Sequence, residues 1–169
     1  AGQWGRHLGA RMVGVVGGAE KARLAREHGY EEVIDRTRED IVERVRAVTG
    51  GAGVPVVYDS VGRATFDASI KCLKPRGFFV SFGTTTGAPP PVEAGLLQKQ
   101  GSLYFTRPTL VTYTASREDL VASATAVFDM LRRGALRVHV GARYPLAEAA
   151  RAHADLEASR TAGSSLLIP

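Results

Sequence analysis

The chain has 169 residues and a formal net charge of +5, with 44% of its residues hydrophobic and 23% charged. This composition fits one globular domain of usual size and excludes a disordered, collagen-like or coiled-coil chain. The single cysteine, Cys72, excludes an internal disulfide, and no apolar stretch approaches the roughly 18 residues that a membrane-spanning helix needs. We therefore expect a cytoplasmic protein with no membrane partner.

The positive net charge makes nucleic acid a partner to consider. However, acidic and basic residues alternate along predicted helices, as in residues 43–46, which is typical of a solvated face. Aromatic residues make up only 7% of the chain, too few for a platform that stacks bases. We expect no specific nucleic-acid partner.

Apolar runs and stretches of helical spacing alternate along the first two thirds of the chain. The runs predict strands, and the stretches between them predict helices. Because the strands are apolar on both faces, the pattern indicates a parallel sheet covered on both sides, the doubly wound α/β class. The predicted strands are residues 12–16, 32–34, 54–59, 77–83 and 102–106, and the predicted helices are residues 19–28, 39–49, 64–73 and 93–99.

The alternation stops after Pro108, and Ser116 can cap the helix that follows. We place a boundary near Tyr113, which divides the chain into residues 1–112 and 113–169. The second part is predicted to contain helices at 117–133 and 146–159, an extended segment at 136–140 and a strand at 165–168.

Glycines stand where the first predicted strand ends. A nucleotide-binding fold often has there an acidic residue that binds a ribose, but this chain has Gly17 and Gly18, with Lys21 one helical turn on. Arg36, at the end of the next strand, adds a second cation. The pattern indicates a pocket for a 2′-phosphate, hence NADP(H) rather than NAD, or else a tight turn beside two solvated cations.

Three other strand ends mix glycine with hydroxyl residues, at 59–62, 82–87 and 106–108. Such surfaces suit a nicotinamide and its ribose, with Phe82 as an apolar wall, although ordinary turn chemistry explains any one of them.

Several signatures are absent from the sequence. Gly51 and Gly53 follow a helix rather than a strand, so we interpret them as a helix-ending turn and not as a pyrophosphate loop. The four histidines have no zinc-ligand spacing, and no serine lies in a nucleophile elbow. We expect neither a catalytic residue nor a metal site in this chain.

An ordered series of short motifs resembles the zinc-independent, zeta-crystallin-like NADPH:quinone oxidoreductases of the medium-chain dehydrogenase/reductase superfamily. The resemblance runs from the first residue to the last. It is carried by residues 3–4, 8–10, 16–17, 21, 57–62, 80–83, 101–104, 106–108, 144–146, 152–153 and 163–169.

The resemblance implies roles for the residues at the strand ends. At position 36 the family commonly has a tyrosine, whereas this chain has Arg36. Because arginine is a cation, this difference is consistent with the expected preference for a cofactor with a 2′-phosphate. The implied cofactor-binding residues are Gly17, Gly18 and Lys21 at the 2′-phosphate, Ser60 and Val61 at the adenosine ribose, Phe82, Gly83 and Thr84 at the nicotinamide ribose, Pro108, Thr109 and Leu110 at the carboxamide, and Arg160 reaching back from the C-terminal part.

The resemblance also implies that this chain is the C-terminal half of a longer enzyme. The family's first half is a GroES-like catalytic lobe, followed by a strand and a pyrophosphate loop. We therefore expect a Rossmann-like sheet lacking its first strand, in which the strands at 12–16 and 54–59 do not pair with each other, and a C-terminal segment that belongs to the GroES-like lobe.

The main functional hypothesis is the cofactor-binding portion of an NADPH-dependent quinone oxidoreductase, which passes a hydride to a quinone or activated enone without metal. A non-catalytic nucleotide-binding or scaffold module is the alternative, and an S-adenosylmethionine-dependent methyltransferase is less favoured because Lys21 and Arg36 would have no anionic target. We also expect a homodimer that pairs through the edge strand at 102–106.

Overall fold

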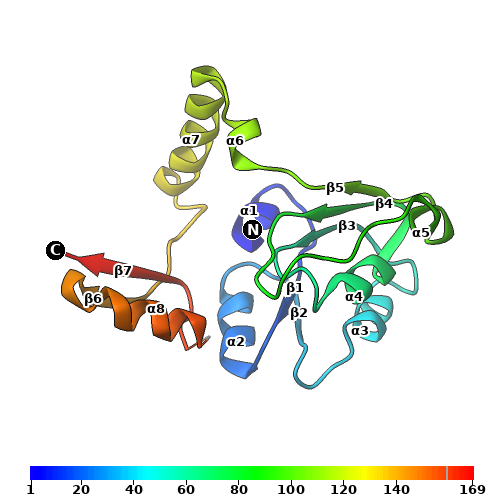
Figure 1. Ribbon diagram of the computed structural model, residues 1–169, viewed down its shortest axis with the longest axis horizontal. Coiled ribbons are helices and arrows are strands. Elements are labelled where there is room, and N and C mark those ends of the chain that lie inside the picture. Colours follow the sequence, from blue (N-terminus) through cyan, green and yellow to red (C-terminus); the bar gives the residue numbers. More distant parts are fainter. Residues whose placement is uncertain (159) are drawn as a thin grey trace.

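Helices and strands alternate as far as β5 and then follow a different order (Figure 1). The computed structural model describes residues 1–158 and 160–169. Its elements are α1 (Gly2–His7), β1 (Val13–Val16), α2 (Ala19–Glu27), β2 (Glu32–Asp35), α3 (Ile41–Val48), β3 (Val54–Asp59), α4 (Phe66–Lys71), β4 (Leu73–Ser81), α5 (Ala94–Lys99), β5 (Tyr104–Thr106), α6 (Leu110–Tyr113), α7 (Arg117–Arg132), β6 (Val140–Pro145), the 3₁₀ turn η1 (Leu146–Glu148), α8 (Ala149–Glu157) and β7 (Ser164–Ile168).

The strands of the described residues form three parallel sheets. β1 pairs with β2, the strands β3, β4 and β5 form a second sheet in that order, and β6 pairs with β7. Helices connect the parallel strands, which confirms the predicted α/β class. Within the described residues β1 and β3 lie in different sheets and do not pair, as expected for this strand order.

The largest core cluster lies between the β3–β4–β5 sheet and the helices α4 and α5. Phe66 and Ile70 of α4 pack against Phe79 of β4, which is 1% exposed. The Phe79 ring lies 5.5 Å from the Phe66 ring and 5.4 Å from the Phe105 ring. Full burial of such an aromatic side chain contributes about 1.5 to 3 kcal/mol, so this cluster fixes the sheet whose strand ends are analysed below.

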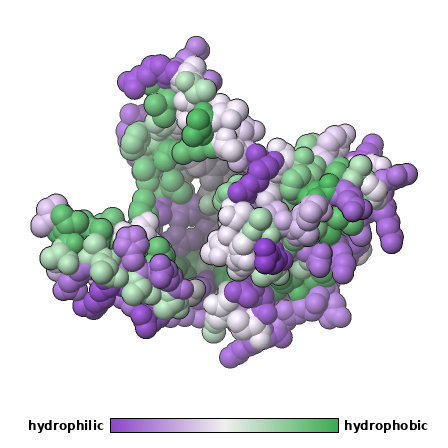
Figure 2. Space-filling view, viewed as in Figure 1, coloured by the Kyte–Doolittle hydropathy of each residue, from purple (hydrophilic) through white to green (hydrophobic). Residues whose placement is uncertain are grey.

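The opposite face of the same sheet is open. Tyr58 is 68% exposed, Tyr104 54% and Phe78 46%, and the Phe78 and Tyr104 rings stack at 4.6 Å. In Figure 1, α7 stands away from this sheet, and Figure 2 shows the molecule hollowed between them, with hydrophobic residues gathered along α7. None of the described helices combines the length and the apolar character needed to cross a membrane.

The boundaries of three predicted elements in the first part were wrong. The predicted helix at 64–73 ends at Lys71, because Leu73 is buried and pairs with Val54 as the first residue of β4. The predicted strand at 77–83 therefore begins earlier and ends at Ser81. The edge strand predicted at 102–106 begins only at Tyr104, because Ser102 has a φ of 57° and the chain still turns there.

The C-terminal part differs more from the prediction. The extended segment predicted at 136–140 is a strand at 140–145 instead, because pairing with β7 begins at Val140. The helix predicted at 146–159 starts as η1 and continues as α8 to Glu157, and its predicted last residue, 159, lies outside the described residues. The short helix α6 was not predicted.

Two local predictions were confirmed. Ser116 Oγ accepts a hydrogen bond from the Asp119 N–H at 3.0 Å and so caps α7. Gly51, with a φ of 85°, donates its N–H to the Arg46 carbonyl at 2.8 Å and closes α3 as a helix-ending turn.

Candidate functional site

The turn after β1 contains Gly17 and Gly18, and the side chain of Arg36 lies next to it. Gly18 is the N-cap of α2 with a φ of 97°, a conformation that favours glycine. A Cβ atom placed on Gly17 would lie 3.4 Å from Nη2 of Arg36, so the guanidinium of Arg36 lies next to the glycine backbone. The carboxyl ends of β1 and β2 therefore bring together Gly17, Gly18 and Arg36.

Asp35, the last residue of β2, fixes this turn and was missed in the sequence. Its Oδ1 atom accepts hydrogen bonds from the Gly18 N–H at 2.8 Å and from the N–H and hydroxyl of Thr37 at 3.0 and 2.7 Å. The Thr37 hydroxyl, followed by the two N–H groups, holds the pKa of Asp35 below its ordinary value of 3.8. An aspartate followed two residues later by threonine is the local signal that could have identified it.

Lys21 and Arg160 come from distant parts of the chain but line the same hollow of about 350 Å³, called here the polar hollow. Arg160 Nη2 forms an ion pair with Asp155 Oδ1 at 2.9 Å, and Asp155 also accepts a hydrogen bond from the Tyr144 hydroxyl at 3.0 Å. Burial, and then the hydrogen bond to Asp155, raises the pKa of Tyr144. The other lining residues are Glu20, His139, Gly141, Ala142, Tyr144, Thr161 and Ala162.

The loop after β3 is ordered by Asp59, which is 5% exposed. Its carboxylate accepts four hydrogen bonds, from the N–H groups of Val61 and Gly62 at 2.8 and 2.9 Å and from the hydroxyls of Thr65 and Ser69 at 2.8 and 2.7 Å. Burial alone would raise the pKa of Asp59, but these hydrogen bonds outweigh it, so the pKa lies below its ordinary value of 3.8. Asp59 is thus an ionised structural residue beneath the predicted ribose contacts.

The loops after β3 and β4 are locked together. The Phe82 N–H donates to the Asp59 carbonyl at 2.9 Å, and the Thr85 hydroxyl donates to the Ser60 carbonyl at 2.9 Å. A Cβ atom on Gly83 would overlap the Ser60 carbonyl oxygen and lie 2.7 Å from the Ser60 Cα atom, so this position requires glycine.

The predicted nicotinamide and ribose residues therefore share one surface. Ser60, Phe82 and Thr84 are exposed on it, with Val61 and Gly83 partly buried beneath them. The arrangement offers two hydroxyls beside one apolar ring.

Arg107 connects the segment after β5 to this surface by hydrogen bonds. Its Nη1 atom donates to the Ser81 carbonyl at 3.0 Å and to the Gly83 carbonyl at 3.4 Å. The predicted residues 108–110 follow directly, and Thr109 caps α6 by accepting a hydrogen bond from the Thr112 N–H. Leu110 is 78% exposed, so it contacts little of the described chain.

The predicted residues fall into two groups on different sheets. Gly17, Gly18, Lys21, Arg36 and Arg160 lie around the β1–β2 sheet, whereas residues 60–61, 82–84 and 108–110 lie at the β3–β4–β5 sheet. Apart from Arg160, which precedes β7, both groups lie at or just after the carboxyl ends of parallel strands, where ligands bind in this class of fold.

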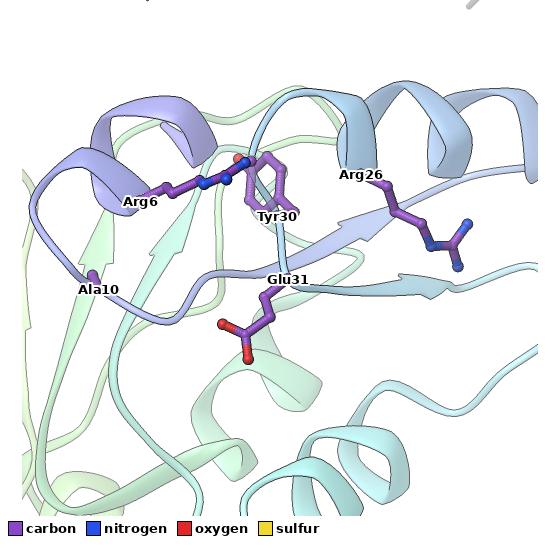
Figure 3. A pocket seen from close by; sticks show the side chains of 6 residues that line it. Arg6, Ala10, Arg26, Tyr30 and Glu31 are labelled. Atoms are coloured by element: carbon purple, nitrogen blue, oxygen red, sulfur yellow. The ribbon is translucent and has the colours of Figure 1, made fainter. Parts of the chain in front are cut away.

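A second hollow, of about 300 Å³, lies at the opposite strand ends. It is lined by Arg6, Ala10, Arg26, Gly29, Tyr30 and Glu31. Figure 3 shows that Arg26 points away from Arg6, and Glu31 is already paired with Arg11 at 3.1 Å. Its charged groups do not converge on one point, and we assign no ligand to it.

The described part of the chain contains no group of three or more His, Cys, Asp or Glu side chains that could hold a metal ion. Cys72 is 3% exposed in the core, and burial raises the pKa of its thiol to about 11.

Comparison with known proteins gives a consistent picture. The family described as zinc-binding dehydrogenase matches residues 28–167. A quinone oxidoreductase of Pseudomonas aeruginosa is 48% identical over 167 residues, which cover 99% of this chain and 51% of that protein. A 2-haloacrylate reductase of Burkholderia is 40% identical, covering 98% of this chain and 50% of that protein.

Among solved structures, the Escherichia coli quinone oxidoreductase in complex with NADPH is similar with a TM-score of 0.96 and 47% identity. The alignment covers 100% of this chain and 52% of that one. The chain therefore spans about half the length of these relatives, and the resemblance found in the sequence is confirmed.

Proposed function

We propose, from the premise that this chain belongs to the zinc-binding dehydrogenase family, that it is the cofactor-binding part of an NADPH-dependent quinone oxidoreductase. The observation that carries the proposal is the shared position of Lys21 and Arg160 in the polar hollow. Two cations that line one hollow suit the doubly charged 2′-phosphate that distinguishes NADPH from NADH.

The turn after β1 supports this choice of cofactor. A carboxylate at that point would repel a phosphate, and Gly17 and Gly18 bring none. The Gly18 N–H and the N–H and hydroxyl of Thr37 offset part of the charge of the nearby Asp35 carboxylate. Arg36 adds a third cation beside Gly17. The site thus has donors for an anion and a backbone that a phosphate can approach closely.

The second group of residues would hold the nicotinamide end. Ser60 and Thr84 present hydroxyls for ribose oxygens, Phe82 gives an apolar wall, and the backbone at residues 108–110 offers partners for the carboxamide. When bound, the cofactor supplies the hydride that reduces the substrate. The residues of this chain would bind and orient it, and we assign no metal and no catalytic residue to them.

The substrate in this proposal is a quinone or an activated enone. Support comes from the relatives' names, which include quinone oxidoreductases and a 2-haloacrylate reductase, an enzyme named for an alkene activated by a carboxyl group.

The test is NADPH oxidation by the intact protein that contains this chain, with 1,4-benzoquinone as acceptor and NADH as the competing cofactor. We expect quinone-dependent oxidation that favours NADPH. NADPH binding without such oxidation would instead indicate a non-catalytic nucleotide-binding module, and binding of S-adenosylmethionine would indicate a methyltransferase.

We also propose that the protein is a homodimer through residues 102–106. β5 is the last strand of its sheet, so one of its backbone edges is open to pairing with a second copy. Sedimentation should give a dimer, and Tyr104→Lys should shift it toward monomer because charge on an edge opposes strand pairing. A wild-type monomer at micromolar concentration would refute this proposal.

The proposal has two further parts. The chain divides into residues 1–112 and 113–169, and the protein is cytoplasmic. Tyr113 is 67% exposed beside a polar connection, so limited proteolysis by chymotrypsin should cut there first. The single cysteine suits a reducing compartment, and cell fractionation tests the location.

A further inference from the structure

Two segments far apart in the sequence meet at the first turn of α1. Nε2 of Gln3 donates to the Arg137 carbonyl at 3.1 Å, and the Arg137 N–H donates to Oε1 of Gln3 at 2.6 Å. One side-chain amide therefore holds both backbone groups of one residue, as a neighbouring β-strand would.

The α1 side of this clamp is fixed to α2. A Cβ atom on Gly2 would lie 2.6 Å from the His28 carbonyl oxygen, and a Cβ atom on Gly29 would lie 3.0 Å from the Gln3 nitrogen. Backbone packs directly on backbone at these glycines, so Gln3 has a fixed place relative to α2. Lys21 lies on that helix.

The other side of the clamp leads to Arg160. The His139 ring lies 5.7 Å from the His28 ring, and the His139 carbonyl accepts the Ser164 N–H at 2.9 Å. A Cβ atom on Gly163 would lie 2.6 Å from the same carbonyl oxygen, so the segment before β7 rests on His139. Residues 137–139 therefore link α1 and α2 to the segment that contains Arg160.

We propose that Gln3 is a positioning residue that holds Arg160 beside Lys21 in the polar hollow and so contributes to the selection of NADPH over NADH. The inference rests on the proposed function. Gln3 does not line the hollow, and its effect is transmitted through Arg137 and His139. Hydrogen bonds to a phosphate weaken steeply with small displacements of the donor, so loss of the clamp would lower the contribution of Arg160.

The test measures dissociation constants of adenosine 2′,5′-bisphosphate and of 5′-AMP, which differ only in the 2′-phosphate. Arg160→Ala should weaken the bisphosphate roughly 10- to 100-fold, and Gln3→Ala about threefold to tenfold, with little change for 5′-AMP. The double variant should bind no more weakly than Arg160→Ala alone, because Gln3 acts through Arg160. Gln98→Ala, an exposed glutamine on α5, is the matched control and should change neither constant.

Equal weakening of both nucleotides by Gln3→Ala, or an effect that adds to that of Arg160→Ala, would overturn the inference in favour of a general structural role. If Gln3→Ala does not fold, Gln3→Glu keeps the acceptor for the Arg137 N–H and should show a smaller but equally selective loss.

Lys21→Ala distinguishes a failure of the proposed 2′-phosphate site from a failure of the positioning role of Gln3. If it leaves the ratio of the two constants unchanged, the 2′-phosphate site itself is wrong. If it lowers the preference for the bisphosphate while Gln3→Ala does not, only the positioning role fails.

Discussion

Replacing Gly83 by alanine would push a methyl group into the backbone of Ser60. The new Cβ atom would overlap the Ser60 carbonyl oxygen and lie 2.7 and 2.8 Å from the Ser60 Cα and carbonyl carbon. Neither partner is a flexible side chain, and the Ser60 carbonyl is also held by the Thr85 hydroxyl. The loops after β3 and β4 must therefore separate to accommodate the methyl group.

Overpacking of a rigid site costs about 1 to 3 kcal/mol, and we expect the upper end here because backbone must move. For a chain of this size, a loss of about 3 kcal/mol lowers the melting temperature by about 6 to 12 °C. The binding of NADPH should weaken as well, since the same loops form the proposed nicotinamide surface.

The matched control is Gly95→Ala in α5, where a Cβ atom would meet nothing within 4 Å. Removing a glycine from a helix should stabilise the protein by about 0.5 to 1 kcal/mol. Thermal unfolding followed by circular dichroism measures both variants. A Gly83→Ala variant that melts at the wild-type temperature would refute the close approach of the two loops.

Three further predictions follow from single side chains. Lys21→Ala should weaken NADPH binding by about 1.5 to 3 kcal/mol and hardly change NADH binding, as measured by calorimetry. Because the pKa of Asp59 is lower in the folded protein than its ordinary 3.8, ionised Asp59 stabilises the fold above that pH, and the stabilisation disappears as the pH falls through the lowered value. Asp59→Asn should therefore cost about 1.5 to 3 kcal/mol at pH 7 and flatten the acid limb of the stability profile, and an unchanged acid limb would contradict it. Ser116→Ala should cost about 1 kcal/mol in urea unfolding through loss of the α7 cap, and no loss would show that the cap is dispensable.

Local patterns in the sequence were sufficient for most of the first part of the fold. Short apolar runs between helical stretches predicted β1 to β5, although one face of the β3–β4–β5 sheet is open in this chain, where Tyr58 is 68% exposed. Gly51 and Ser116 were assigned correctly, since turns and caps depend on a few neighbouring residues. The approximate strand ends followed from the same alternation, whereas the roles of the candidate residues there, and the choice of Arg160, came from the resemblance to the family.

Only the tertiary structure decided what depends on distant partners. Leu73 belongs to β4 and not to the predicted helix, because it pairs with Val54, and the local sequence does not show this pairing. Asp35 orders the turn after β1 and Asp59 orders the loop after β3. Both do so through hydrogen-bond donors, among them the N–H groups of Gly18 and Gly62, whose positions only the tertiary structure shows.

That Lys21 and Arg160 line one hollow, and that Gln3 binds the backbone of Arg137, depends equally on the complete fold. The sequence specifies helices and strands through neighbours along the chain, at spacings of two to four residues. The tertiary structure joins residues from opposite ends of the chain, because buried surfaces and backbone hydrogen bonds are satisfied wherever a partner lies close in space. For this protein, the residues of the proposed cofactor site were predicted from the sequence, whereas their division between two sheets was decided by packing.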